Sequence, residues 1–301
     1  MERSPSKLQV SIVLAVGIVA VSTAAIWIRL AVNAAGGGGA GLSLVLAASR
    51  LLLSSLLLVP TWAKVRWQNV PQALGFAVAS GICMAAHFAT WTTSLSYTSI
   101  AAATTIVTSN PLWIVILSWW WFGERISRRT AVGIAIALFG GFLVGTSETG
   151  VTSISTNPLL GNTLALFGAW TISLYLLFGR EAQRRGLGTT GYIAVAYTVG
   201  ALILVPTPMV FGASYLGHPW PVYGAIVLMA LLPQLIGHTS INWTLRWLSP
   251  TLVTLAILLE PVCSSLFGYW AFGEVPSLGV FVGALVLLSG VGIAALDLSR
   301  H

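Results

Sequence analysis

Four ionisable side chains lie deep inside apolar stretches of the sequence: Arg50, His87, His238 and Glu260. A charge in such surroundings is costly, which makes each of these residues a candidate for function. The carboxylate of Glu260 could bind a cationic group or exchange a proton, and the planar guanidinium of Arg50 could hold a carboxylate or a phosphate. The alternative is that Arg50 and Glu260 pair with each other and only hold helices together. For Arg50 we favour that structural interpretation.

The two histidines occupy similar places in two stretches that lie far apart in the sequence. His87 is followed by Thr90 and Trp91 at helical spacing, and His238 is followed by Asn242. Each set forms a polar stripe along one side of a helix, which predicts that this side faces the protein interior. Such a stripe either lines a cavity or forms hydrogen bonds between helices.

Polar residues also precede two prolines, in the pairs Asn110-Pro111 and Glu260-Pro261. A proline inside a helix removes one backbone hydrogen bond, so that freed carbonyls can face a cavity. Deeply placed tryptophans either line a pocket for a flat or apolar solute or provide packing bulk. We predict a substrate-binding cavity bordered by His87, Trp91, Asn110, Trp113, Trp170, His238 and Glu260, with Arg50 as the candidate charge partner of Glu260.

The composition defines the environment in which these residues must work. Of the 301 residues, 56% are apolar and only 7% are charged, against about 25% in a typical soluble domain. This excludes an ordinary water-soluble fold, because the charged residues are too few to cover its surface. The apolar residues fall in runs of about twenty, the length that a helix needs to cross a bilayer. The net charge of +7 therefore indicates Lys and Arg retained in the cytoplasm rather than binding of nucleic acid.

The apolar runs predict an all-α membrane protein with ten transmembrane helices. The expected spans are roughly 9–31, 41–60, 72–97, 99–122, 129–147, 158–179, 189–211, 220–246, 250–272 and 277–297. With ten spans, both termini lie on one side, and nearly every Lys and Arg falls on that side. The positive-inside rule then predicts cytoplasmic termini.

The two halves of the chain are related by an offset of 150 residues. Pro111 aligns with Pro261, Gly123-Glu124 with Gly273-Glu274, and Gly140 with Gly290, all without a gap. We therefore expect one five-helix repeat over 1–150 and a second over 151–301. Because five is an odd number, the second repeat must enter the membrane from the opposite side. Inverted repeats around a site at the midplane are typical of secondary transporters.

These motifs resemble the drug/metabolite transporter superfamily, and within it the ten-helix EamA type. The resemblance depends on Asn110-Pro111, Gly123-Glu124-Arg125, Glu260-Pro261 and Gly273-Glu274, and it extends over essentially the whole chain. It implies a transporter of small organic metabolites, in many members an exporter, with a central cavity between two five-helix halves. Members carry amino acids, nucleotide sugars or sugar phosphates, so the resemblance leaves the substrate class open.

The sequence thus predicts a secondary transporter that moves an amino acid or a similar amphipathic solute, in the export direction, by alternating access. Two alternatives are an integral-membrane enzyme acting on lipid, which would need clustered catalytic groups, and a membrane scaffold without transport activity. The ionisable residues of the spans are dispersed, so we assign no catalytic residue and do not expect an enzyme.

The expected partners are the lipid bilayer and a small-molecule substrate, with no nucleic acid. The sequence has no metal-ligand cluster and no phosphate-binding loop, so we expect no metal and no cofactor. Transport would be driven by the gradient of the solute itself or by a proton or ion gradient. Glycine pairs at helical spacing are compatible with a monomer or a homodimer. We expect the protein to be located in a bacterial inner membrane.

Overall fold

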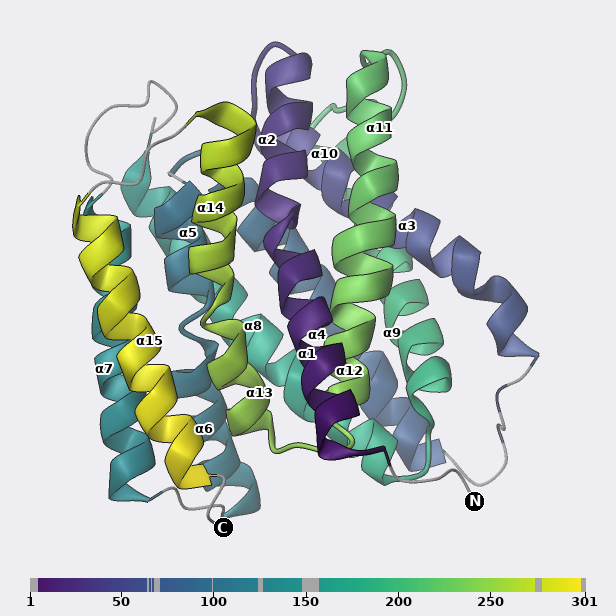
Figure 1. The fold of residues 1–301 in the computed structure, drawn as a ribbon. Coiled ribbons are helices and arrows are strands. Elements are labelled where there is room, and N and C mark those ends of the chain that lie inside the picture. The colour runs from purple at the N-terminus through teal and green to yellow at the C-terminus, as the bar shows by residue number, and fades with distance from the viewer. Residues whose placement is uncertain are drawn as a thin grey trace.

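The computed structural model describes residues 5–63, 65, 67, 71–98, 100–123, 127–147, 157–273 and 278–298. All regular structure in these residues is helical (Figure 1). In chain order the helices are α1 (Lys7–Ser22), α2 (Ala24–Ala34), α3 (Ala40–Trp62), α4 (Pro71–Ser94), α5 (Ile100–Val107), α6 (Asn110–Phe122), α7 (Arg128–Ser147), α8 (Pro158–Arg184), α9 (Thr189–Leu204), α10 (Thr207–Val210), α11 (Trp220–Met229), the π-helix η1 (Ala230–His238), α12 (Thr239–Thr244), α13 (Pro250–Ile257), α14 (Glu260–Phe272) and α15 (Leu278–Leu298).

Seven stretches in the described part of the chain are long and apolar enough to cross a membrane. They are Lys7–Ala34, Ala40–Trp62, Pro71–Ser94, Leu159–Arg184, Thr189–Val210, Trp220–Thr244 and Pro250–Phe272. Each coincides with one of the ten expected spans. The other three expected spans correspond to α5 together with α6, to α7, and to α15. That these three segments cross the membrane stays a prediction. The seven stretches are those expected of an integral, multi-pass membrane protein.

Several of the long helices are interrupted in the middle of the bundle. Thr23 separates α1 from α2, Thr108 and Ser109 separate α5 from α6, and Leu258 and Leu259 separate α13 from α14. The latter two breaks precede Pro111 and Pro261, which have no N–H to donate to the carbonyl four residues earlier. The helix that begins at Trp220 instead widens into the π-helix around Pro233. The bundle thus has irregular backbone at its centre.

α7 and α15 form a closely packed antiparallel pair at one edge of the bundle (Figure 1). A Cβ atom added to Gly140 would lie 2.7 Å from the carbonyl oxygen of Gly283, and one added to Gly290 would lie 2.6 Å from that of Gly133. Only glycine permits this approach of the two backbones. We call this contact the glycine seam, defined by Gly133, Gly140, Gly283 and Gly290.

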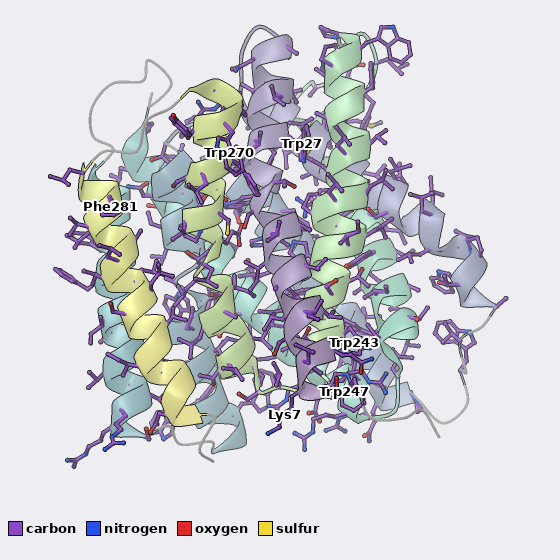
Figure 2. All side chains as sticks on the ribbon, viewed as in Figure 1. Lys7, Trp27, Trp243, Trp247, Trp270 and Phe281 are labelled. Atoms are coloured by element: carbon purple, nitrogen blue, oxygen red, sulfur yellow. The ribbon has the colours of Figure 1, made fainter. Side chains whose placement is uncertain are left out.

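The remaining long helices surround the centre of the bundle. α4 packs along α8 and α9, α1 packs along η1 and α12, and α2 packs against α11. α1 begins and α15 ends at the same end of the bundle (Figure 1). Figure 2 shows that Lys7, Trp243 and Trp247 lie at this end, whereas Trp270 and Phe281 lie toward the opposite end.

Candidate functional site

A cavity lies at the centre of the bundle, where the helices are interrupted. Its lining includes Val21 and Ala24 on either side of the first break, Val107 and Thr108 at the second, and Ile257 at the third. The complete lining consists of Val21, Ala24, Arg50, His87, Phe88, Trp91, Val107, Thr108, Asn110, Ile172, Leu176, His238, Ile241, Ile257 and Glu260. The broken helices therefore bring together side chains from nearly the whole length of the chain.

Six of the eight residues singled out in the sequence line this cavity: Arg50, His87, Trp91, Asn110, His238 and Glu260. The other two, Trp113 and Trp170, are not part of its lining. Trp170 is 39% exposed and packs against Phe167, with ring centroids 5.7 Å apart. Trp113 is half-buried against the core. The two tryptophans therefore differ from Trp91, which is buried at the cavity wall.

Arg50 is buried on the α3 wall of the cavity, with 1% of its surface exposed. Its Nε donates a hydrogen bond to Oε1 of Gln234 at 2.9 Å, and its guanidinium carbon lies 4.0 Å from the centre of the Phe88 ring. The Nη2 atom is buried and has no hydrogen-bond partner. Gln234 and Phe88 thus orient the guanidinium while one of its donor nitrogens stays unsatisfied.

Glu260 begins α14 directly after the break at Leu258 and Leu259, and it is half-buried at the cavity wall. In the part of the chain that the structure describes, no ion pair joins Glu260 to Arg50, although both line the cavity. The direct pairing that we favoured for Arg50 is therefore not made in this conformation. The guanidinium of Arg50 and the carboxyl group of Glu260 reach the cavity from different helices, α3 and α14.

His87 is oriented by a hydrogen bond between its Nδ1 and the carbonyl oxygen of Gly168, at 3.0 Å. A carbonyl oxygen can only accept, so Nδ1 carries the proton, and in the neutral ring Nε2 is left as an acceptor. The imidazole stacks on Trp91, with centroids 5.9 Å apart and planes inclined by 5°. His238 lies edge-on to Phe88 at 5.4 Å. Both imidazoles are thus held by aromatic neighbours at the cavity.

Two further polar atoms at the cavity are buried without a hydrogen-bond partner: Oδ1 of Asn110 and Nε1 of Trp91. Burial of an unsatisfied donor or acceptor costs about 1–3 kcal/mol, so such atoms are uncommon in a finished core. Their position in one cavity, together with Nη2 of Arg50, gives a set of donors and an acceptor that a bound solute could satisfy.

Some features of the site were not foreseen from the sequence. Phe88 lies next to His87 in the chain but carried no signal of its own, and it contacts both Arg50 and His238. Gln234 lies four residues before His238 on the predicted polar stripe, but its hydrogen bond with Arg50 was not predicted. Nothing near Thr23 predicted a helix break there, since no proline or glycine adjoins it.

The chemistry of the cavity is that of a binding site. It combines a guanidinium, a carboxylate and two imidazoles with apolar walls, the mixture that small-molecule sites use to orient a ligand. Among the described residues, no group of three or more His, Cys, Asp or Glu side chains could hold a metal ion. A multi-pass helical membrane protein with such a cavity at broken helices has the architecture of a membrane transporter.

Comparison with known proteins identifies the family. The sequence model of the EamA-like transporter family matches residues 10–146 and again residues 159–296. The chain belongs to the EamA-like transporter family, and it is an integral membrane transporter.

Individual relatives are also named as transporters or exporters. An uncharacterized transporter of Archaeoglobus fulgidus is 23% identical over 73% of this chain and 75% of its own length. The uncharacterized transporter YyaM of Bacillus subtilis is 28% identical over 65% of each chain. A probable terminal-alkyne amino-acid exporter of Streptantibioticus cattleyicolor is 25% identical over 85% of this chain and 84% of its own. A solved crystal structure superposes with a TM-score of 0.74 over 98% of this chain and 99% of that chain, at 18% identity, and so shares the fold.

Proposed function

We propose that this transporter is a secondary exporter of an amino acid or a similar amphipathic solute, and that it works by alternating access. The central cavity carries this proposal, because polar groups without partners and apolar walls meet where the helices are broken. The seven residues predicted to border the site, including Trp113 and Trp170, remain candidates on this account, together with the predicted charge partner Arg50. The six at the cavity wall are the stronger ones, because they can reach a solute in this conformation.

Inverted repeats over residues 1–150 and 151–301, each with five spans, would supply the two moving bodies. The offset of 150 residues supports this arrangement, because α5 and α6 correspond to α13 and α14, break included. The glycine seam is symmetric under the same offset. Gly140 contacts Gly283 and Leu287, while its counterpart Gly290 contacts Gly133 and Ala137. The double match to the family agrees with both observations.

We infer that the end of the bundle at which α1 begins is cytoplasmic. Lys7 lies at this end (Figure 2), and α7 begins there with Arg128 and Arg129, because it runs antiparallel to α15. Such an accumulation of basic residues is typical of the cytoplasmic side. Reporter fusions in a bacterial inner membrane test this: fusions after residues 67 and 186 should be cytoplasmic, and those after 38, 151 and 216 external. An external reporter after residue 67 would contradict the orientation.

The amino-acid component of the proposal has two supports. The cavity contains groups of both charges, as a zwitterionic solute requires, and one relative of similar length is named as a probable exporter of an amino acid. The energy source would be the gradient of the solute or of a proton or ion. Glu260 is the candidate proton-exchanging group, because its carboxylate lies at the cavity.

Reconstitution tests the proposed function. Proteoliposomes that contain only this protein should accumulate radiolabelled amino acids from a metabolite panel when an outward or inward gradient is imposed, and protein-free liposomes should not. If the fold and orientation of the reconstituted protein are verified and no solute of the panel enters the proteoliposomes, the proposed transport function is contradicted. Chemical modification of the lipid under the same conditions would favour the membrane enzyme instead.

A further inference from the structure

The polar stripe of the helix through His238 continues beyond the cavity. Asn242 lies four residues after His238 and directly after the cavity-lining Ile241, and it is completely buried. Trp243 and Trp247, which follow it in the chain, lie at the end of the bundle at which α1 begins (Figure 2). Asn242 is therefore located between the cavity and that end, and its side chain is part of neither the cavity lining nor the surface.

Two residues of α8 form hydrogen bonds with Asn242. Its side-chain Nδ2 donates to the hydroxyl oxygen of Tyr175, and its backbone carbonyl oxygen accepts from Nε2 of Gln183 at 3.0 Å. Tyr175 is completely buried, directly precedes the cavity-lining Leu176, and has its ring edge-on to that of His238. The contact between α8 and α12 thus begins at the cavity wall and extends along about two turns of α8.

The local structure explains why both partners of the second hydrogen bond are available. The end of a helix leaves carbonyl groups without a partner in the helix. Near the end of α12, the N–H of Arg246 bonds to the carbonyl of Trp243. The carbonyl of Asn242 accepts from Gln183 instead. Thr189 orients the amide of Gln183, because its hydroxyl donates to Oε1 at 2.7 Å and so directs Nε2 toward α12.

The contact of α8 with α4 and α9 is of a different kind. Ser80 of α4 donates to the carbonyl oxygen of Tyr175, and since a hydroxyl has one hydrogen, Tyr192 of α9 donates to Ser80. A Cβ atom added to Gly179 would lie 2.6 Å from Cζ of the Tyr192 ring, so this ring is seated directly on α8. Separation of such closely packed helices would lose packing contacts, whereas water can replace the hydrogen bonds of Asn242 at a small net cost.

We propose that Asn242, Tyr175 and Gln183 form a gate that closes the cavity toward the end of the bundle at which α1 begins. This proposal rests on the alternating access proposed above. The hydrogen bonds between α8 and α12 exist while this side is closed, and water replaces them when the cavity opens there. α8 stays with α4 and α9, and α12 moves with η1 and α1, against which it packs. Because α8 and α12 both belong to the second repeat, opening includes a movement within that repeat.

Thiol labelling of the cavity from each side of the membrane tests the gate. Ile257 at the cavity wall is replaced by cysteine in a protein whose Cys83 and Cys263 are changed to alanine. Tyr175→Phe keeps the ring and removes the hydroxyl that accepts from Asn242. Loss of one hydrogen bond shifts an equilibrium by about two- to tenfold. A membrane-impermeant thiol reagent should label position 257 faster by this factor from the side at which α1 begins, and no faster from the other side.

Two further variants complete the test. Gln183→Met removes the donor to Asn242 at similar side-chain length and should shift labelling in the same direction, so it decides alone if Tyr175→Phe does not fold. Tyr215→Phe is the matched control, because its hydroxyl donates to the carbonyl of Val205 at 2.7 Å. Tyr215 precedes α11, which begins at the opposite end of the bundle (Figure 1). This variant also loses one tyrosine hydrogen bond and should leave both labelling rates unchanged.

An unchanged ratio of the two labelling rates in both gate variants, with position 257 labelled from both sides, would overturn the gate and leave alternating access intact. Faster labelling from both sides would also overturn the gate, because the hydrogen bonds would then only stabilise the fold. If position 257 is never labelled from the side at which α1 begins, in variants that transport, the gate and alternating access through this cavity are rejected together.

Discussion

The glycine seam and the central cavity both join early and late parts of the chain, but they are built on opposite principles. At the seam, α7 and α15 approach so closely that an added methyl group on Gly140 or Gly290 would collide with backbone of the facing helix. At the cavity, buried polar atoms of Arg50, Trp91 and Asn110 have no hydrogen-bond partner. The first contact is a close approach of two backbones, whereas the second leaves buried polar atoms without a partner.

This difference indicates a division of labour. Helices packed this closely have few alternative arrangements, so the seam is suited to hold the two parts together. A cavity with unsatisfied polar groups has a free-energy cost that a ligand can relieve. The predictions that follow separate the two regions, because changes at the seam should affect folding and changes at the cavity should affect transport.

The largest effect is expected for Gly290→Ala at the seam. The new Cβ would lie 2.6 Å from the carbonyl oxygen of Gly133, so α7 and α15 must separate, and overpacking of this kind costs about 1–3 kcal/mol or more. Thermal unfolding in detergent should show a marked loss of stability.

The matched control for this change is Gly292→Ala on the same helix, where no heavy atom lies within 4 Å of the added Cβ. This variant should be as stable as the unmodified protein or slightly more stable, because alanine favours the helix by about 1 kcal/mol. Equal stability of both variants would show that the seam is not tightly packed.

The second prediction concerns Glu260→Gln, which removes the charge and keeps the size of the side chain. Transport should fall at least tenfold while the unfolding temperature changes little, since no ion pair to Arg50 is broken. Initial transport rates in proteoliposomes at about pH 5 to 8, together with thermal unfolding, measure both effects.

The double change Arg50→Gln with Glu260→Gln distinguishes function from simple pairing. If the two residues only neutralised each other, the double variant would recover both stability and transport. We expect no recovery of transport. Unaltered kinetics in a stable Glu260→Gln protein would remove this carboxylate from the site.

A smaller effect is expected from a matched pair of tryptophan changes. Trp91→Leu should weaken solute binding by about three- to tenfold, because it removes the aromatic wall that stacks on His87. Trp170→Leu should leave binding within about twofold, since this residue does not line the cavity in this conformation. Competition titrations with the transported solute compare the two. A larger effect of Trp170→Leu would extend the site beyond the cavity described.

The sequence predicted the helix breaks at Pro111 and Pro261, because proline acts locally through its missing N–H. It could not predict which tryptophans reach the cavity. Ile172 and Leu176 of α8 line it, and Trp170 is two residues from Ile172, which places it about 200° around the helix. Packing of the whole bundle decides which face is inward.

The orientation of the Arg50 side chain could not be predicted from the sequence either, because Gln234, which accepts its hydrogen bond, lies 184 residues away in the chain. Hydrophobic runs locate a buried charge, but they do not reveal which of several distant polar groups will orient it. From the sequence we favoured pairing of Arg50 with Glu260 over contact with a solute. Among the described residues no ion pair joins the two side chains in this conformation, and contact of Arg50 with a solute stays a proposal.

The central claim is that this cavity opens alternately to both sides of the membrane, and thiol accessibility tests it most directly. A single cysteine replaces Ile257 at the cavity wall, in a protein in which Cys83 and Cys263 are changed to alanine. A membrane-impermeant thiol reagent is applied from either side of oriented vesicles. The control is Ile293→Cys in the same background, because Ile293 lies on the outer face of α15 within a predicted membrane span and does not line the cavity. We predict labelling of position 257 from both sides, slowed by the transported amino acid, and no labelling of position 293. Labelling of position 257 from one side only, in a protein that transports, would contradict alternating access through this cavity.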